Sequence, residues 1–523
     1  MTGAAPRVVP LADLLGVLPE RELRGPMPGA VRGLTDDSRR VTEGACFVAV
    51  RGLRTDGHRF IPQAVERGAR AIVAEPPDPV PGGPVGRILV PDTRWALPRL
   101  ADAYFGHPSR ALLVVGITGT NGKTTTSYLV EALLRARGLE TGIIGTIQYV
   151  IRGAAREASQ TTPEALELQG LLAEMGAAGV GGVAMEISSH ALELRRVDGV
   201  ALDVAIFTNL TQDHLDFHGT MERYAQAKRR LFFELLRGGG KPGATAVLNG
   251  DDPVGASWAR ELPGPVLTFG LGAGHAVRAR VYESGWGGIR LTAETPAGSL
   301  RLASPLIGEH NVMNLLGGVA AGLALGLGPE AIVTALGGVA SVPGRFERVD
   351  AGQDFLVVVD YAHTPDALRR VLETARRLTA GRLGVVFGAG GDRDRGKRPI
   401  MGRLAAELAD RVWLTSDNPR SEDPKAIIAE IAAGVVPPPP GGYTSDPDRR
   451  EAIREALAWG RPGDTLVIAG KGHETYQVVG SRILPFDDRQ VVREILTAMT
   501  LGTKRPEGSA SAEASRPDHR AGA

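Results

Sequence analysis

The stretch ALLVVGITGTNGKTTT, residues 111–126, decides the fold of the central part of this chain. It begins as an apolar strand, passes through a glycine-rich turn, and continues as a helix that opens with Lys123 and a run of hydroxyl side chains. Small residues let backbone N–H groups converge on phosphate oxygens, and the helix N-terminus adds partial positive charge. A strict Walker pattern would place glycine at position 117, where this chain has Ile117. The stretch therefore predicts a variant phosphate loop that binds a nucleotide, with the Thr124 hydroxyl offered to Mg²⁺.

Length, charge and cysteine content limit the classes of protein that remain. A chain of 523 residues should form three or four domains at about 150 residues each. Its net charge of +1, from 60 basic and 59 acidic residues, argues against a nucleic-acid or anionic-membrane partner. The single cysteine, Cys46, excludes a disulfide framework or a cysteine metal cluster, and its apolar neighbours predict a core position.

Neither end of the chain nor its interior predicts membrane insertion. The first 20 residues contain no basic segment followed by an apolar stretch, so no secretory signal is expected. Residues 315–327 are apolar but shorter than the roughly 20 residues a span requires, which favours a buried, glycine-rich helix. We expect a cytoplasmic, monomeric enzyme with small-molecule partners, no nucleic acid and no membrane insertion.

The spacing of apolar runs predicts an α/β fold with three domains. Residues 1–107 form a small N-terminal α/β domain with apolar runs at 46–50, 71–74 and 88–90. Residues 108–341 form the central ATP-binding domain with a mainly parallel sheet, whose strand-like runs are 112–115, 182–185, 203–207 and 246–248.

The remaining domain is predicted by strands and helices that alternate. Residues 342–501 contain apolar runs at 355–359, 383–387, 411–414 and 465–468, with helical patterns at 365–379, 399–409, 424–434 and 448–458. This alternation is typical of a Rossmann-like parallel sheet with helices on both faces. Residues 502–523 are rich in small, polar and charged residues, which predicts a disordered tail.

Polar side chains follow two of the predicted central strands. Glu186 lies in MEISSH after one strand, and His214 lies in TNLTQDH after another. The carboxyl ends of parallel strands are where ligands bind. Glu186 and His214 are therefore candidate metal neighbours of the phosphate loop, although either alone could be a helix cap or a satisfied loop residue.

An ordered set of motifs resembles the Mur ligase family, and most closely its MurE type, over residues about 30 to 490. The motifs after the phosphate loop are TTP at 161–163, MEISSH at 185–190, TNLTQDHLDFH at 208–218, GEHN at 308–311, PGRFE at 343–347, DYAHTPD at 360–366, GGDRD at 390–394, DNPR at 417–420 and GKGHE at 470–474. The resemblance implies a UDP-sugar domain, a central ATPase domain and a C-terminal domain that carries the incoming amino acid.

The activity that this resemblance implies is ATP-dependent amide ligation in peptidoglycan precursor synthesis. The γ-phosphoryl group of ATP would activate the carboxylate of UDP-N-acetylmuramoyl-L-alanyl-D-glutamate as an acyl phosphate, which the amine of meso-2,6-diaminopimelate then attacks. Such chemistry depends on positioning and charge neutralisation. The catalytic set implied is Lys123, Lys228, Glu186 and His214, and closure of the C-terminal domain would exclude water.

The resemblance also assigns nucleotide and metal contacts. The ATP-binding residues it implies are Thr118, Gly119, Thr120, Asn121, Gly122, Lys123, Thr124, His310, Asn311, Arg345 and Asp360. The Mg²⁺ contacts it implies are Thr124, Glu186, His214 and Lys228, the last as a carbamate formed with CO₂. Without the resemblance, Lys228 would be read as an ordinary surface lysine on a helix.

Two further sets are carried over for the donor and the acceptor. The donor set is Ser38, Thr161, Thr162, Ser188 and Arg196, and the diaminopimelate set is Arg393, Asp417, Asn418, Pro419, Arg420, Gly470 and Glu474. Family members with arginine at position 420 use diaminopimelate, whose distal carboxylate a guanidinium can bind in bidentate fashion. L-Lysine lacks that carboxylate, and such sites discriminate by roughly 10⁴ to 10⁵.

Two alternatives remain open at this point. One is another ligase of the superfamily, such as a folylpolyglutamate synthetase or an L-lysine-adding enzyme, against which Arg420 and the separate N-terminal domain argue. The other is a nucleotide switch or motor, which would hydrolyse ATP without an amino acid acceptor.

Overall fold

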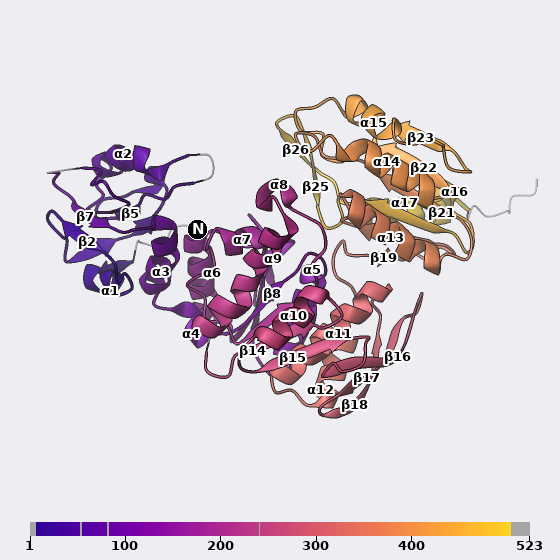
Figure 1. Cartoon of the computed structure of the whole chain (residues 1–523). Coiled ribbons are helices and arrows are strands. Elements are labelled where there is room, and N and C mark those ends of the chain that lie inside the picture. The colour runs from indigo at the N-terminus through magenta and orange to yellow at the C-terminus, as the bar shows by residue number, and fades with distance from the viewer. Residues whose placement is uncertain (1–6, 53–54, 81–82, 240, 504–523) are drawn as a thin grey trace, which may run out of the picture. The chain divides into compact units, whose positions relative to one another are not determined.

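A computed structural model of the chain describes residues 7–52, 55–80, 83–239 and 241–503 (Figure 1). The chain divides into two compact units, Met1–Val342 and Pro343–Ala523. Both units combine helices with mainly parallel sheets, which confirms the predicted α/β class. Helix α17 (Asp488–Thr503) includes the first two residues of the predicted disordered tail, and the rest of that tail lies outside the described residues.

The first unit begins with a five-stranded sheet, in the order β2-β7-β6-β5-β4. Its strands are β2 (Glu22–Arg24), β7 (Gly86–Leu89), β6 (Ala71–Ala74), β5 (Cys46–Val48) and β4 (Leu34–Thr35), and only β2 pairs antiparallel. Helices α1 (Leu11–Gly16) and α3 (Thr93–Phe105) contribute to the core on one face, and α2 (Ile61–Glu66) to the core on the other. Cys46 is buried as predicted, and burial raises the pKa of its thiol to about 12.

An eleven-stranded sheet forms the centre of the first unit. Its parallel part runs β9 (Thr141–Ile144), β12 (Gly182–Glu186), β8 (Leu113–Thr118), β13 (Val204–Phe207), β14 (Thr245–Asn249), β15 (Val266–Gly270) and β16 (Val277–Gly285). Antiparallel strands extend both edges, β10 (Gln148–Ile151) and β11 (Ala154–Glu157) at one and β17 (Gly288–Thr295) and β18 (Gly298–Ser304) at the other. The sequence predicted the four inner strands β8, β12, β13 and β14, and these are confirmed.

Successive residues of the inner strands enter opposite cores. Val114 packs in the core with α6 (Ala165–Ala177) and α10 (Pro253–Glu261), whereas Val115 packs in the core with α5 (Lys123–Ala136), α11 (Glu309–Ala324) and α12 (Pro329–Gly337). A strand buried on both faces reads as a continuous apolar run, which is why these strands were visible in the sequence. Helix α11 contains the buried, glycine-rich segment that the sequence predicted. Among the residues described, the structure has no helix with the length and apolar character that a membrane crossing needs.

The second unit contains a six-stranded sheet in the order β19-β20-β24-β21-β22-β23. Its strands are β19 (Glu347–Val349), β20 (Leu356–Asp360), β24 (Thr465–Ala469), β21 (Leu383–Phe387), β22 (Arg411–Thr415) and β23 (Tyr443–Asp446), and only β19 pairs antiparallel. Its helices are α13 (Pro365–Leu378), α14 (Lys397–Leu408), α15 (Pro424–Ala432), α16 (Arg449–Trp459) and α17. The hairpin of β25 (Tyr476–Val479) and β26 (Arg482–Pro485) follows the last sheet strand.

A buried ion pair joins α16 to α17. Arg449 donates from Nε and Nη2 to the two carboxylate oxygens of Asp488, each at 2.7 Å, and both side chains are fully buried. The guanidinium also donates to the backbone oxygens of Ser416 and Ala469, at the ends of β22 and β24. The pair thus connects two helices with the carboxyl edge of the sheet, where loops carry the acceptor motifs.

We expect Asp488→Asn to lower the free energy of unfolding of the second unit by about 3–5 kcal/mol, because it leaves the buried Arg449 charge uncompensated. Urea unfolding, with hydrogen exchange followed peptide by peptide, would measure this unit separately. Glu494→Gln is the matched control, since the exposed Arg450–Glu494 pair joins the same two helices at 2.7 Å and should contribute less than about 1 kcal/mol. Equal losses in the two variants would contradict the role given to the buried pair.

Candidate active site

The phosphate loop connects β8 to α5 through two glycines with positive φ. Gly119 has φ of +149° and Gly122 has φ of +85°. A Cβ on Gly119 would lie 1.9 Å from Thr208 Oγ1, and one on Gly122 would lie 2.4 Å from Asn314 Oδ1. The loop therefore requires glycine at both positions, for space as well as for backbone conformation.

Hydrogen bonds join the phosphate loop to the loop that follows β13. Thr120 N donates to Asn209 O at 2.8 Å, and Asn121 N donates to Asn209 Oδ1 at 3.0 Å. Thr208 Oγ1 donates to Asn121 O at 2.6 Å, and Thr211 N donates to Thr120 Oγ1 at 3.0 Å. These contacts fix the backbone of the phosphate loop from one side, while Thr118 remains a buried residue at the end of β8.

Two lysine side chains converge on the same carbonyl. Lys123 Nζ donates to Gly119 O at 3.0 Å and to Thr120 O at 2.9 Å, and Lys228 Nζ donates to Gly119 O at 2.9 Å. Lys228 lies on α9 (Met221–Arg230), is 1% exposed, and has its ammonium nitrogen 4.5 Å from the Tyr224 ring centroid. Burial, and then the nearby charge of Lys123, lower the pKa of Lys228 well below its ordinary value. Lys228 is thus part of the site and not the surface lysine that composition alone suggests.

Glu186 lies at the end of β12 with its carboxylate directed to the phosphate loop. Thr124 Oγ1 donates to Glu186 Oε2 at 3.1 Å. Thr146 donates to the same carboxylate from Oγ1 at 2.9 Å and from its backbone N–H at 2.9 Å. The structure therefore brings together Thr124 and Glu186, as predicted from the strand ends, and adds Thr146, which the sequence did not indicate.

His214 lies beside these groups with an unusual backbone. It has φ of +53° and precedes α8 (Leu215–His218), and its ring centroid is 4.9 Å from that of His190. Burial lowers the pKa of His214, the neighbouring Asp213 carboxylate opposes that shift, and the charge of Lys123 lowers the pKa further. The ring is therefore neutral near neutral pH, with a nitrogen lone pair that can accept a proton or a metal.

Two of the predicted ATP-binding residues, His310 and Asn311, lie at the start of α11. His310 is exposed, whereas Asn311 is buried and donates from Nδ2 to Ile307 O at 2.8 Å. Asn311 Oδ1 accepts from Asn314 Nδ2 at 2.8 Å, and Asn314 is the residue that contacts Gly122. The sequence identified Asn311 but not Asn314, which connects α11 to the phosphate loop.

Four of the five predicted donor residues form one cluster beside Glu186. Thr162 Oγ1 donates to Glu186 O at 2.9 Å and accepts from Ser188 N at 3.0 Å. Thr161 Oγ1 lies 3.1 Å from Thr146 Oγ1. Arg196 donates to Thr162 O at 3.1 Å and also to the side chain of Gln160. Ser38 lies in the N-terminal sheet region, where its hydroxyl donates to Gln63 Oε1 at 2.6 Å.

In the second unit, Asp360 and Arg345 belong to a group of loops at the carboxyl ends of β20 and β24. Asp360 is buried and accepts from Phe346 N at 2.7 Å and from Ala362 N at 2.8 Å. Burial raises the pKa of Asp360, while the Arg345 charge opposes that rise. The Arg345 guanidinium lies 4.9 Å from the ring centroid of Tyr361.

Three of the predicted acceptor residues meet around a buried lysine. Asn418 donates from Nδ2 to Glu474 Oε2 at 2.8 Å, and Lys471 Nζ donates to the same oxygen at 3.0 Å and to Asn418 Oδ1 at 3.3 Å. A Cβ on Gly470, whose φ is +113°, would lie 2.8 Å from Asp417 Oδ2. Lys471, which is fully buried, was not assigned a role from the sequence. The Lys471 ammonium forms an ion pair with the carboxylate of Glu474.

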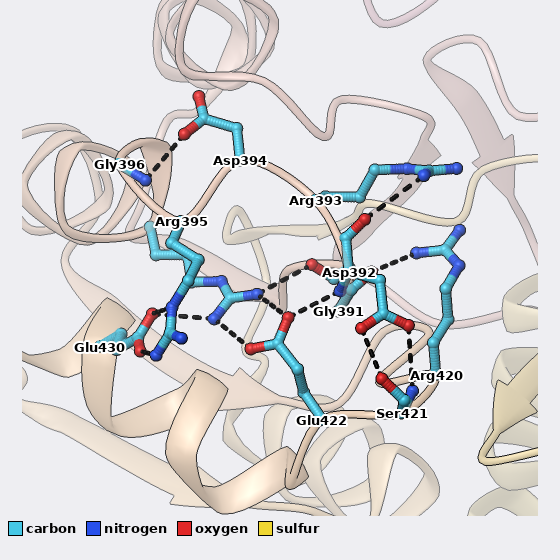
Figure 2. Close-up of polar contacts among 12 residues, drawn as sticks. Gly391, Asp392, Arg393, Asp394, Arg395, Gly396, Arg420, Ser421, Glu422 and Glu430 are labelled. Carbon is cyan, nitrogen blue, oxygen red and sulfur yellow. Dashed lines mark hydrogen bonds and ion pairs between the residues drawn. The ribbon is translucent and has the colours of Figure 1, made fainter. Parts of the chain in front are cut away.

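The remaining acceptor residues surround two glycines of the loop after β21. A Cβ on Gly390 would lie 2.9 Å from Arg420 Nη1 and 3.7 Å from Arg393 Cγ, and one on Gly391 would lie 1.8 Å from Pro419 O. Arg420 donates from Nη1 to Gly391 O at 2.8 Å. Figure 2 shows both guanidinium groups on the side of the loop away from Glu422 and Glu430. Within the described residues, neither Arg393 nor Arg420 forms an ion pair with a carboxylate.

Comparisons with protein-family models match most of this chain. The model described as the Mur ligase middle domain matches residues 117–322, and the Mur ligase glutamate ligase domain matches residues 344–472. The model described as the Mur ligase family catalytic domain matches residues 30–105.

Individual relatives agree with these matches. The chain is 47% identical over 497 residues to the UDP-N-acetylmuramoyl-L-alanyl-D-glutamate–2,6-diaminopimelate ligase of Geobacter metallireducens, covering 92% of this chain and 97% of the relative. The ligase of the same name from Geobacillus thermodenitrificans is 48% identical over 471 residues, covering 90% and 95%. A solved structure of a ligase of that name aligns with a TM-score of 0.65 at 34% identity, covering 90% of this chain and 95% of that one. The MurF ligase of Thermotoga maritima, solved in complex with ADP, shares the fold at 23% identity, with a TM-score of 0.56 and coverage of 90% and 97%.

We expect Gly122→Ala to weaken the binding of a non-hydrolysable Mg²⁺–ATP analogue at least about tenfold, because forced displacement of Asn314 or of the loop costs about 1–3 kcal/mol. Isothermal titration calorimetry would measure the affinity. Gly138→Ala is the matched control, because Gly138 follows the same helix with φ of +80° and a Cβ there would meet nothing within 4 Å. An equal loss of affinity in the control would show that the contact with Asn314 does not matter.

Proposed function

The chain belongs to the Mur ligase family, and on this premise we propose how its residues carry out the reaction. The chain is an ATP-dependent ligase that joins 2,6-diaminopimelate to UDP-N-acetylmuramoyl-L-alanyl-D-glutamate in peptidoglycan precursor synthesis. The donor carboxylate attacks the γ-phosphorus of ATP and releases ADP, and the acceptor amine then displaces phosphate from the acyl phosphate. One amide bond forms for each ATP cleaved.

The observation that carries the assignment of the acceptor is the pair Arg393 and Arg420. Both flank Gly390, and neither forms an ion pair with a carboxylate in the described part of the chain. The charge of Arg420 acts on the nearby Asp392 carboxylate but forms no ion pair with it. Guanidinium groups that form no ion pair favour a ligand with a carboxylate, which they can bind in bidentate fashion. The distal carboxylate of meso-diaminopimelate supplies that charge, whereas L-lysine does not. Asp417, Asn418, Pro419, Gly470 and Glu474 complete this proposed site.

On the nucleotide side, the residues of the phosphate loop stabilise charge. The ammonium of Lys123 and the backbone of residues 118–122 would contact the phosphates, where negative charge is redistributed during transfer. Hydrogen bonds to the loop after β13 hold this loop before the nucleotide binds, so the reaction requires little reorganisation. His310, Asn311, Arg345 and Asp360 stay proposed contacts to ATP.

The residues around Glu186 fit Mg²⁺. A hydroxyl and a carboxylate 3.1 Å apart are hard oxygen ligands of the kind that this ion prefers. The described residues contain no group of three or more His, Cys, Asp or Glu side chains that could hold a metal alone. This fits an ion that takes its remaining ligands from phosphates and water. When bound, Mg²⁺ would neutralise phosphate charge, with Thr124, Glu186, His214 and carbamylated Lys228 as the proposed protein contacts.

The environment of Lys228 supports carbamylation. A neutral amine is the form that attacks CO₂, giving a carbamate and releasing one proton, and burial beside Lys123 lowers the pKa of Lys228 toward that form. The modification would replace a second cation beside Lys123 with an anion. A carbamate at this position could hold Mg²⁺, whereas an ammonium would repel it.

The cluster beside Glu186 would bind the donor. Thr161, Thr162, Ser188 and Arg196 lie next to the carboxylate proposed to hold Mg²⁺, so a donor carboxylate bound there would be close to the phosphates. Ser38 is proposed to contact the uridine nucleotide in the N-terminal domain, residues 1–107. We propose that the chain continues with a central ATP-binding domain, residues 108–341, and a C-terminal amino-acid-binding domain, residues 342–501. Monomeric state and cytoplasmic location stay predictions.

We expect purified protein to release phosphate from ATP only when both UDP-N-acetylmuramoyl-L-alanyl-D-glutamate and meso-diaminopimelate are present, with the tripeptide product detected by mass spectrometry. Arg420→Met should lower kcat/KM for diaminopimelate about 10²- to 10³-fold, because truncating a charged hydrogen-bonded pair costs about 2–5 kcal/mol. Arg395→Met is the control, since Arg395 pairs with Glu430 instead.

The outcome separates the alternatives that the sequence left open. A preference of the wild-type enzyme for L-lysine would overturn the acceptor assignment but retain ligation. Release of phosphate that is indifferent to every acceptor would favour a nucleotide switch.

We expect ¹³C-labelled bicarbonate to give a carbamate signal in the NMR spectrum of the wild-type protein that is absent in Lys228→Arg. The burial of Lys228, which lowers the pKa of its amine, is the physical reason, because an ordinary lysine with a pKa of about 10.4 is protonated near neutral pH. Lys425→Arg, which changes an exposed lysine, should retain the signal. Persistence of the signal in Lys228→Arg would assign the adduct to another residue.

A further inference from the structure

A fully buried arginine connects the two loops that carry the proposed acceptor residues. Arg398, on α14, has a side chain that is 0% exposed. Its Nη1 donates to Glu422 Oε2 at 2.9 Å and to Glu430 Oε2 at 2.8 Å, and its Nη2 donates to Glu422 Oε1 at 2.8 Å and to Gly390 O at 3.2 Å. A buried charge costs several kcal/mol unless it is paired. The buried guanidinium of Arg398 therefore depends on these carboxylate partners. The proposed reaction gives Arg398 no role of its own.

Hydrogen bonds extend from Glu422 to the residues that lie next to Arg393 and Arg420 in the chain. Its Oε1 accepts from Asp392 N at 2.6 Å, and the Asp392 carboxylate accepts from Ser421 Oγ at 2.6 Å and from Ser421 N at 3.2 Å. Figure 2 shows Glu422, Asp392 and Ser421 linked in this order, with Arg393 and Arg420 next to them. Asp392 and Ser421 are the chain neighbours of the two arginines. A shift of Glu422 would therefore disturb Asp392 directly and Ser421 through it, next to Arg393 and Arg420.

The two loops adopt conformations that need such support. Asp392 has φ of +53° and Arg420 has φ of +52°, in the left-handed region. A residue other than glycine in that region costs on the order of 1–3 kcal/mol, and persists only where its surroundings determine it. At Asp392, hydrogen bonds to Glu422 and Ser421 hold the backbone in this conformation.

We propose that Arg398 is a positioning residue for acceptor recognition, which acts through Glu422 to hold Arg393 and Arg420 where they can bind the distal carboxylate of the acceptor. The proposal rests on the proposed function. Arg398 touches neither the reacting atoms nor the acceptor in this scheme, and its effect is confined to the geometry of the two loops.

A purely structural role makes a different prediction. Arg398 also contacts Glu430 on α15, and that bond connects two helices. Glu430 reaches the loop after β21 only through its pair with the exposed Arg395, two residues beyond Arg393, and does not contact Asp392 or Ser421 in the described residues. If Arg398 only stabilised helix packing, loss of Glu430 and loss of Glu422 would have similar consequences. The two glutamates therefore form a matched pair, since each accepts from the same guanidinium.

The test is steady-state kinetics of Glu422→Gln and Glu430→Gln in the full-length protein, with meso-diaminopimelate, ATP and the UDP-linked donor each varied in turn. Glutamine at 422 has the same shape but only one acceptor oxygen, so it cannot serve Arg398 and Asp392 as the carboxylate does. We expect the KM for diaminopimelate to rise at least about tenfold in Glu422→Gln, since displacement of a binding group by 1 Å can cost about 10²-fold. The KM values for ATP and donor, and kcat at saturating acceptor, should change little.

Glu430→Gln should leave the KM for diaminopimelate within about twofold of the wild-type value, because exposed or partly exposed charge pairs contribute little to geometry elsewhere. Equal effects of the two variants, or an unchanged acceptor KM in a folded Glu422→Gln, would overturn the positioning role while the proposed function stands. Failure of the wild-type enzyme to form the diaminopimelate product would overturn both. Thermal unfolding of each variant establishes that the compared proteins are folded.

Discussion

Hydrogen bonds between loops that follow neighbouring parallel strands hold both candidate sites in place. In the first unit the loop after β8 is bonded to the loop after β13, through Thr120, Asn121 and Asn209. In the second unit the loop after β21 is bonded to the loop after β22, where Gly391 N donates to Asn418 O at 2.9 Å. Parallel strands end at a common edge, so these loops can satisfy each other's backbone groups.

The pattern of charge pairing separates structural from binding arginines. Arg398 and Arg449 are fully buried, and each is matched by carboxylates. Arg393 and Arg420 form no such pair within the described residues. In the first unit, Lys123 and Lys228 both donate to Gly119 O next to the proposed phosphate site.

Much of the fold and part of the candidate site could be predicted from the sequence. Strands buried on both faces, such as β12 and β13, are continuous apolar runs, and their ends located Glu186 and His214. The hairpin β10–β11 at the edge of the central sheet and the separate hairpin β25–β26 escaped prediction because β11 and β26 are exposed and carry no such run. The sequence did not indicate three residues of the candidate sites, which are Thr146, Asn314 and Lys471. Their partners come close to them only in the folded chain, and nothing in the sequence pattern distinguishes them from other polar residues. Arg398 is one of 60 basic residues, and only its burial sets it apart.

The backbone of Arg420 is held independently of its side chain. Arg420 N donates to Val478 O at 3.0 Å and Gly480 N donates to Arg420 O at 2.7 Å, so the hairpin β25–β26 fixes its left-handed conformation. Any L-residue at this position would meet the same backbone bonds and much the same strain. If Arg420 binds the acceptor as proposed, single substitutions at position 420 can change acceptor choice, because the loop does not have to be rebuilt each time. The hairpin would keep the backbone at position 420 in place while substitutions exchange the side chain that is proposed to bind the acceptor.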